Sequence, residues 1–244
     1  MIRKSFWKIG LIVVVVALSF SASQSAEGGF DEGMDALNRG DYIVALKEFR
    51  ISAKQGNLGA QNNIGKIYQK GLGVKRNYKI ALKWYRRSAK QGHKYGQYNL
   101  GVMYDKGLGV QKNYKLAVRW YRKSAEQGLP SAQHNLGLMY LNGEGVPRNY
   151  QLAFKWLRKS ADQGNGSAQY NLGFIYRNGL GVPKDYSLML KWYRKSAEQR
   201  FVLALYNLGD IYEQGIGVPQ NYGLAFKWYL ESAEHGYPNG PYDL

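Results

Sequence analysis

The sequence predicts an all-α protein, an α-solenoid of helix–turn–helix hairpins that repeat every 36 residues. Three kinds of position keep this period: a tryptophan, a glycine inside a helical stretch, and a Gly-x-Gly-Val turn. They recur at Trp84, Trp120, Trp156, Trp192 and Trp228, at Gly65, Gly101, Gly137, Gly173 and Gly209, and from Gly71, Gly107, Gly143, Gly179 and Gly215. A period of roughly 20 to 50 residues is typical of solenoids and propellers. The helical spacing inside each unit favours the solenoid.

Residues 57–92 show how one unit begins. From Ala60 onward, apolar residues follow at the fourth, seventh and eighth positions, which is the stripe of an amphipathic helix. Gly65 lies inside this helix and costs about 1 kcal/mol relative to alanine, so its recurrence predicts close approach of a neighbouring helix. Gly71 and Gly73 then end the helix by supplying positive φ angles.

A second helix completes the unit. Asn77 is a favoured N-cap residue, and the helix continues through Ala81, Trp84 and Ala89 until Gly92 ends it. The equivalent N-cap positions are Asn113, Asn149, Asp185 and Asn221. Small and bulky residues alternate along this helix, which favours interlocking with adjacent helices.

The first 26 residues have the layout of a secretory signal peptide. A basic start with Arg3, Lys4 and Lys8 precedes an apolar run, residues 11–20, and small residues follow. The run is shorter than the roughly 20 residues of a membrane span. We therefore expect an exported protein, periplasmic or secreted; an uncleaved signal that anchors the chain in the inner membrane is the alternative, and the cleavage position stays open.

The composition is strongly basic and contains no cysteine. Of the formal charge of +17, the signal region contributes three basic and no acidic side chains, so +14 remains after export. Such an excess favours anionic partners: acidic proteins, polysaccharides, the cell wall or a membrane surface. Export makes nucleic acid an unsuitable partner. Without cysteine, the stability of the chain comes from packing rather than from disulfides.

The repeated pattern, which begins Ala-x-x-x-Leu-Gly-x-x-Tyr and continues with Asn/Asp-Tyr-x-x-Ala-x-x-Trp, resembles the Sel-one-like repeat (SLR), a relative of the tetratricopeptide repeat (TPR). The resemblance covers five units, residues 57–237, and implies a right-handed solenoid that binds proteins. Residues 27–56 form a shorter, TPR-like capping hairpin in which Glu48 replaces the tryptophan. Residues 238–244 align with Pro130–Leu136 as the truncated start of a sixth unit. The last full hairpin could therefore stack on another chain, but Leu230, Glu231 and Glu234 favour a polar cap.

The resemblance implies that the first helices line the concave face, where the positions that differ between copies are candidates for partner binding. Three columns vary: Asn62, Tyr98, His134, Tyr170 and Tyr206; Lys66, Val102, Leu138, Phe174 and Asp210; and Gln69, Asp105, Leu141, Arg177 and Glu213. The predicted site takes from them Tyr98, Val102, His134, Leu138, Leu141, Tyr170, Phe174, Arg177 and Tyr206. These side chains either anchor a peptide or pack between helices, and tyrosine suits both roles.

Two other recurring sets have structural and functional interpretations. An asparagine recurs on each first helix, at Asn63, Asn99, Asn135, Asn171 and Asn207. It either contacts a bound peptide backbone or, more in keeping with strict repetition, satisfies carbonyl groups of the neighbouring unit. Basic pairs on the second helices predict a positive ridge on the convex side: Arg86 and Arg87, Arg122 and Lys123, Arg158 and Lys159, Arg194 and Lys195. The ridge either binds an anionic polymer or is an ordinary solvated face.

No pattern of catalytic or metal-ligating residues stands out. His93, His134 and His235 lie in different units without nearby ligands, and the recurring serines occupy packing positions. We expect no metal, no cofactor and no enzymatic activity. The leading hypothesis is an exported protein–protein interaction scaffold of the bacterial envelope. The alternatives are a binder of anionic polymers and a β-lactam-hydrolysing member of the family, although members linked to β-lactams carry paired cysteines. The oligomeric state stays open.

Overall fold

The computed structural model describes residues 29–236, which consist of helices and loops without any β-strand. The signal peptide that we predict over residues 1–26 and the sixth-repeat start over residues 238–244 lie outside the described residues. Within the described residues, no helix is both long and apolar enough to span a membrane.

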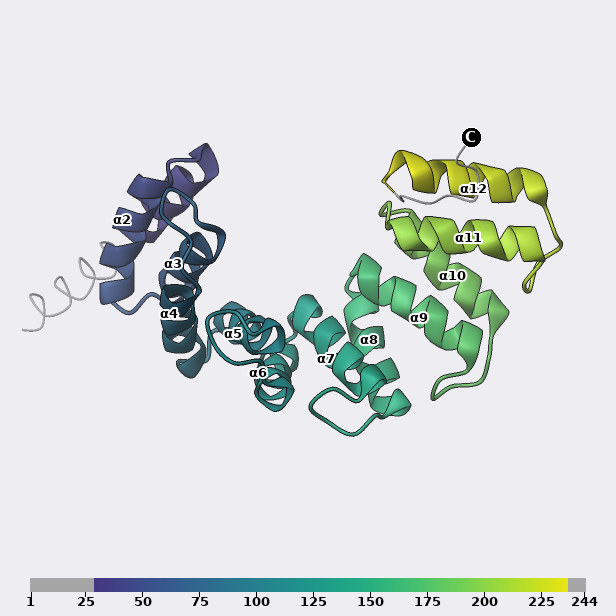
Figure 1. Cartoon of the computed structure of the whole chain (residues 1–244), viewed down its shortest axis with the longest axis horizontal. Coiled ribbons are helices and arrows are strands. Elements are labelled where there is room, and N and C mark those ends of the chain that lie inside the picture. The colour runs from purple at the N-terminus through teal and green to yellow at the C-terminus, as the bar shows by residue number, and fades with distance from the viewer. Residues whose placement is uncertain (1–28, 237–244) are drawn as a thin grey trace, which may run out of the picture. The chain divides into compact units, whose positions relative to one another are not determined.

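The chain divides into two compact units, Met1–Lys112 and Asn113–Leu244. In the first, helical residues 29–39 precede the other helices (Figure 1). These are α2 (Tyr42–Lys54), α3 (Leu58–Lys70), α4 (Tyr78–Lys90) and α5 (Lys94–Lys106). Helix α3 packs against α4, its partner in the hairpin, and α4 packs against α5.

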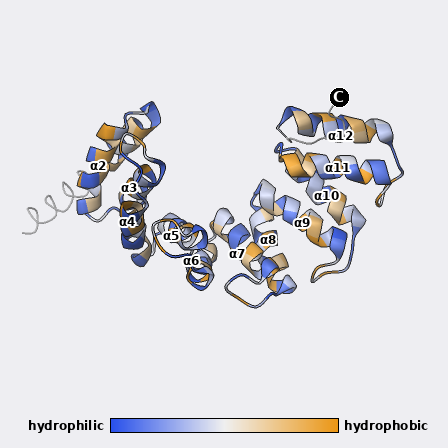
Figure 2. Cartoon of the chain, in the orientation of Figure 1, coloured by the Kyte–Doolittle hydropathy of each residue, from blue (hydrophilic) through white to orange (hydrophobic). Residues whose placement is uncertain are grey.

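The second unit continues the same alternation of first and second helices. Its helices are α6 (Tyr114–Glu126), α7 (Pro130–Asn142), α8 (Tyr150–Asp162), α9 (Gly166–Asn178), α10 (Tyr186–Ala197), α11 (Val202–Gln214) and α12 (Tyr222–Glu234). Each helix contacts the next one along the chain, and the contacts within the hairpins α7–α8, α9–α10 and α11–α12 are the most extensive (Figure 1). Hydrophilic and hydrophobic residues alternate along these helices, as one buried face requires (Figure 2).

The predicted helix ends are confirmed. The side chain of Asn77 accepts a hydrogen bond from the backbone N–H of Ile80 at 3.0 Å, and the four equivalent caps do the same in their copies. The first helices end at left-handed glycines, with φ of 74° at Gly71 and 62° at Gly73. These caps satisfy backbone groups that a helix end leaves unpaired.

The helix glycine lets the two helices of a hairpin touch. A Cβ atom at Gly65 would lie 2.6 Å from the ring of Tyr85, and one at Gly173 would lie 2.6 Å from the ring of Tyr193. Both tyrosines are almost fully buried. The predicted close approach is therefore confirmed, and the approaching helix is the second helix of the same unit.

Buried serines tie each second helix to the start of its first helix. Ser88 Oγ donates to the carbonyl of Leu58 at 2.9 Å, and Ser196 Oγ donates to the carbonyl of Gly166 at 2.8 Å. The hydroxyl thus satisfies a carbonyl without needing water, at a position where only a small side chain fits. The serines are packing residues, as the sequence predicts, with an added hydrogen bond.

Helix α12 exposes an apolar surface. Tyr222, Phe226 and Leu230 are 65%, 56% and 48% exposed. Among the residues equivalent to Phe226 in earlier copies, Leu82, Val118 and Leu190 are buried, and Phe154 is partly buried. This side of α12 is therefore apolar, whereas the glutamates of the helix had favoured a polar cap.

Candidate functional site

The surface formed by the first helices, called here the first-helix face, carries the predicted partner-binding residues. Tyr98 and Val102 lie on α5 in the first unit. The other predicted residues lie on α7, α9 and α11 in the second unit: His134, Leu138, Leu141, Tyr170, Phe174, Arg177 and Tyr206. The structure therefore describes the predicted strip in two separate parts.

In the first unit, Tyr98 and Val102 line an open groove of about 380 Å³ between α3 and α5. One wall comes from α3 and consists of Asn62, Lys66, Gln69 and Lys70. The rest of the lining consists of Tyr85 of α4 and of Tyr95, Tyr98, Asn99 and Val102 of α5. We call it the α3–α5 groove. Hydrogen bonds fix its base: Asn99 Nδ2 donates to Asn62 Oδ1 at 2.8 Å, and the Tyr85 hydroxyl donates to Gln69 Oε1 at 2.6 Å.

In the second unit, the first variable column links neighbouring repeats. Asn171 Nδ2 lies 3.1 Å from His134 Nε2, and Asn207 Nδ2 lies 3.4 Å from the Tyr170 hydroxyl. The recurring asparagine thus bonds a variable side chain of the preceding copy. The structural role that we favoured for it is supported, but its partners in these bonds are side chains rather than the loop carbonyl groups we expected.

The contacts of His134 define its neutral tautomer. Its Nε2 accepts from Asn171, so Nδ1 carries the proton and donates to Asn135 Oδ1 at 3.2 Å. Burial lowers the pKa of His134, and the bond to Asn135 opposes that shift only in part. The residue is a neutral hydrogen-bonding group at neutral pH.

The aromatic members of the predicted site also pack against the second helices. The ring of Tyr170 lies 5.6 Å from that of Tyr193 and 5.3 Å from that of Phe201, and Tyr206 lies 5.2 Å from Tyr229. Partial burial of this kind serves the packing role that we left open. It does not prevent the same rings from contacting a partner.

Phe174 and Arg177 differ in how available they are. Phe174 is 39% exposed. Arg177 donates from Nη2 to Asp210 Oδ2 at 2.9 Å and from Nη1 to Asn207 at 3.3 Å, so its charge is compensated within the chain. Leu138 and Leu141 are half-buried, and Leu141 packs against the core around Tyr193. Phe174 is therefore the most accessible apolar anchor of the predicted site in the second unit.

The first member of each predicted basic pair has a structural role in most copies. Arg86, Arg122 and Arg194 donate to the hydroxyl of the tyrosine 18 residues further along, at 2.9, 2.8 and 2.6 Å. Arg158 instead pairs with Asp162 at 2.9 Å and lies over the Trp192 ring. These arginines link consecutive hairpins.

The second member of each pair lies over a tryptophan ring of its own helix. Arg87 lies 5.8 Å from the Trp84 ring, and the lysines lie 5.0 to 5.2 Å from theirs. These lysines are Lys123 over Trp120, Lys159 over Trp156 and Lys195 over Trp192. The contact is a cation–π interaction that keeps the charge at the surface.

The histidines do not gather into a site. His93 caps α5 by accepting from the backbone N–H of Gly96 at 3.3 Å, and its ring nitrogen contacts Ser88 Oγ at 3.0 Å. Burial lowers its pKa, and Lys94 adds to that shift. Across residues 29–236, no group of three or more His, Asp or Glu side chains is placed to hold a metal ion.

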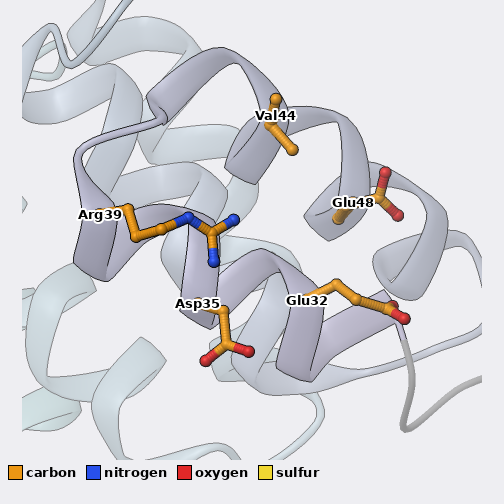
Figure 3. Close-up of a pocket in the computed structure, with 5 residues that line it drawn as sticks. All are labelled: Glu32, Asp35, Arg39, Val44 and Glu48. Carbon is orange, nitrogen blue, oxygen red and sulfur yellow. The ribbon is translucent and has the colours of Figure 1, made fainter.

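A second open groove lies on the N-terminal hairpin and is mainly acidic. Its lining consists of Glu32, Asp35 and Arg39 of the first helix with Val44 and Glu48 of α2, and its volume is about 440 Å³ (Figure 3). Glu48 thus places a carboxylate where the other copies carry tryptophan. The charged lining makes this hairpin unlike the copies that follow it.

A sequence model of the Sel1 repeat matches five consecutive segments that together span residues 59–237. The segments are 59–93, 94–129, 130–165, 166–201 and 202–237. The protein belongs to the Sel1 repeat family. This result confirms the resemblance and the fold class that the sequence predicts.

Solved structures of the same fold agree with this assignment. A Sel1 repeat protein from Oxalobacter formigenes is 38% identical, with a TM-score of 0.81, over 85% of this chain and 83% of its own. A protective antigen of uropathogenic Escherichia coli with an SLR fold is 36% identical, with a TM-score of 0.79, over 89% of this chain. The present chain covers 47% of that antigen. No curated protein matches.

The α3–α5 groove could not be recognised from the Sel1 repeat pattern, because some of its lining residues occupy positions that do not recur from copy to copy. The predicted site took Tyr98 and Val102 from the variable columns but not Lys66, which is in the same column as Val102, and Lys70 and Tyr95 are in none of the three columns. A detectable signal was present, since Lys66 and Lys70 lie one helical turn apart and therefore on the same side of α3.

Proposed function

We propose that this Sel1 repeat protein is an exported, non-catalytic interaction scaffold of the bacterial envelope, which binds a protein or peptide partner on its first-helix face. Sel1 repeats generally mediate protein–protein interactions. The basic N-terminal segment with its apolar run supports export. A protein of this kind is expected in the periplasm or outside the cell.

One contrast supports the binding face. The recurring residues make contacts within the chain: the glycine packs against a tyrosine ring, the serine donates to a backbone carbonyl, and the arginine donates to a tyrosine hydroxyl. Some of the varying first-helix positions stay accessible, most clearly Phe174 at 39% exposure and Lys66 in the α3–α5 groove. Accessible aromatic side chains are the typical anchors of protein interfaces.

Site-specific photo-crosslinking in the native cell tests this proposal. A benzophenone amino acid replaces Phe174 on α9 or, as the control, Tyr186 on α10, which is 41% exposed. We expect a discrete protein adduct from position 174 that is absent from position 186, recovered from the envelope fraction. Identical adducts from both positions, no protein adduct at 174, or a cytoplasmic protein would contradict the proposal.

The alternative is a binder of an anionic polymer or cell-wall component through the second helices. Lys123, Lys159 and Lys195 favour it, because each is exposed and held over a tryptophan ring. Reversing Lys123 and Lys159 to glutamate leaves the arginine–tyrosine links intact. Binding to purified cell wall that is steeply salt-dependent and lost in this variant would support the alternative. Nitrocefin turnover by pure protein would support a β-lactam-hydrolysing function instead.

A further inference from the structure

The α3–α5 groove carries an excess of positive charge without an internal counter-ion. Lys66 and Lys70 are exposed on one wall, and neither forms an ion pair within residues 29–236. No aspartate or glutamate contributes to the lining. Lys94 lies beside the groove, 5.4 Å from the ring of Tyr95. An anionic occupant would be attracted to this surface.

The neutral groups of the groove add hydrogen-bond donors. Asn62 and Gln69 each use the side-chain oxygen as an acceptor, from Asn99 and Tyr85 respectively. Their amide N–H groups have no partner in the described part of the chain. These bonds also fix the orientation of both amides. The groove therefore offers two ammonium groups and two oriented amides, a set that matches carboxylate and peptide carbonyl oxygens.

An apolar side completes the groove. Tyr95 is 47% exposed, and Tyr98 and Val102 are half-buried beside it. A small inorganic anion would leave this surface uncovered, whereas a peptide covers both sides at once with an acidic and an apolar side chain.

From these features we infer that the α3–α5 groove binds an extended acidic peptide segment of a partner protein. This inference rests on the proposed function and specifies the chemistry of the partner. Lys66 and Lys70 lie one turn apart, so their side chains leave α3 about 5–6 Å from each other. In an extended peptide, alternate residues are on one side and about 6.6 Å apart. Two acidic residues separated by one other residue therefore match the lysines, and a following apolar residue reaches Tyr95 and Val102.

Fluorescence anisotropy with a labelled peptide and the full chain provides the test. The probe is Gly-Ser-Glu-Ser-Glu-Leu-Gly, and the control peptide carries glutamine at both glutamate positions. The test variant is Lys66→Gln/Lys70→Gln. The matched variant is Lys79→Gln/Lys83→Gln, which removes two exposed lysines at the same spacing from α4. All four lysines are exposed, so both variants keep the fold, and circular dichroism checks this.

We expect the probe to bind and the Lys66→Gln/Lys70→Gln variant to bind it about tenfold more weakly, as for two partly exposed charge pairs. The Lys79→Gln/Lys83→Gln variant binds the probe within about twofold of wild type. Wild type binds the glutamine peptide no more tightly than the Lys66→Gln/Lys70→Gln variant binds the probe. Equal losses in both variants, or no binding of the probe by wild type, would overturn the inference. So would phosphatidylglycerol vesicles or a single-stranded oligonucleotide that bind through Lys66 and Lys70 when the peptide does not.

The two proposals fail separately. If the Phe174 crosslink identifies a partner and the acidic probe does not bind, the inference about the groove is wrong and the scaffold function stands. If the probe binds and no crosslinked protein is found, the proposed partner binding on the first-helix face at Phe174 is wrong, whereas the binding chemistry inferred for the groove stands.

Discussion

Replacing Gly173 with alanine is expected to destabilise the second unit, although alanine is the better helix former. The new Cβ atom would lie 2.6 Å from Cδ1 and Cε1 of Tyr193 and 2.9 Å from its Cγ. Ordinary carbon–carbon contacts are about 3.5 to 4.0 Å, so the overlap is about 1 Å. Tyr193 is 1% exposed and also packs against the ring of Tyr170, so it has no free space into which to move.

The magnitude follows from two opposing contributions. Alanine in a helix interior gains about 1 kcal/mol over glycine. Overpacking of a filled core costs typically about 1–3 kcal/mol, and an overlap against an enclosed ring belongs at the upper end. We therefore expect the free energy of unfolding of Gly173→Ala to fall by about 2 kcal/mol.

The matched control is Gly223→Ala on α12. A Cβ there meets only Asn221 Oδ1, at 3.4 Å, within a 4 Å radius. The same chemical change should leave stability unchanged or raise it by up to about 1 kcal/mol. Urea unfolding followed by far-ultraviolet circular dichroism measures both variants.

A double-mutant cycle then isolates the contact between Gly173 and Tyr193. In a Tyr193→Ala background the overlap is gone, and Gly173→Ala should become neutral or stabilising. A Gly173→Ala variant at least as stable as wild type, or one equally destabilising in both backgrounds, would refute the explanation of the recurring glycine.

Three further predictions concern single positions. Burial lowers the pKa of His134 below its unfolded value, so the folded state binds fewer protons than the unfolded state. The free energy of unfolding should therefore fall as pH drops from about 7 through 6.5. If the melting temperature of His134→Asn declined with acid as steeply as that of wild type, this prediction would be contradicted. Ser196→Ala should lower the free energy of unfolding by about 1 kcal/mol through loss of a buried hydrogen bond, whereas Ala at the exposed Ser187 of the same helix should have no measurable effect in urea unfolding. Arg200 has a φ of 57°, at a position where the other copies carry glycine. Arg200→Gly should raise the melting temperature slightly, because relief of about 1 kcal/mol of left-handed backbone strain exceeds the entropic cost of glycine. A lower melting temperature would refute that reasoning.

The fold could be predicted because its determinants are local and repeated. Asn77 as a cap, Gly71 as a helix end and Gly65 as a contact glycine each depend on residues within one unit. The period then multiplies each observation. The charge pairs were harder to interpret, since the bond from Arg86 to the Tyr104 hydroxyl joins consecutive hairpins. Sequence spacing alone does not show which surfaces two neighbouring units share.

The roles of the variable columns could not be predicted for the same reason. Position 134 bonds position 171, and position 170 bonds position 207, which is a spacing of one period plus one residue. That spacing is visible only after the first helices are placed side by side. The sequence therefore left open whether Tyr170 anchors a peptide or packs; the structure shows ring contacts to Tyr193 and Phe201, and binding of a peptide stays a prediction.

The same rule separates positions that hold the repeats together from positions available to a partner. The charge of Arg177 is compensated by Asp210 within the chain. Lys66 occupies the column of Asp210 and has no such partner within residues 29–236. A variable residue whose charge is compensated by the next copy links the two repeats. A variable residue without such an ion pair is available to a charged group of a second molecule. Lys66 and Lys70 line the α3–α5 groove without an ion pair in the described residues, so the chemistry of the partner should be sought there first.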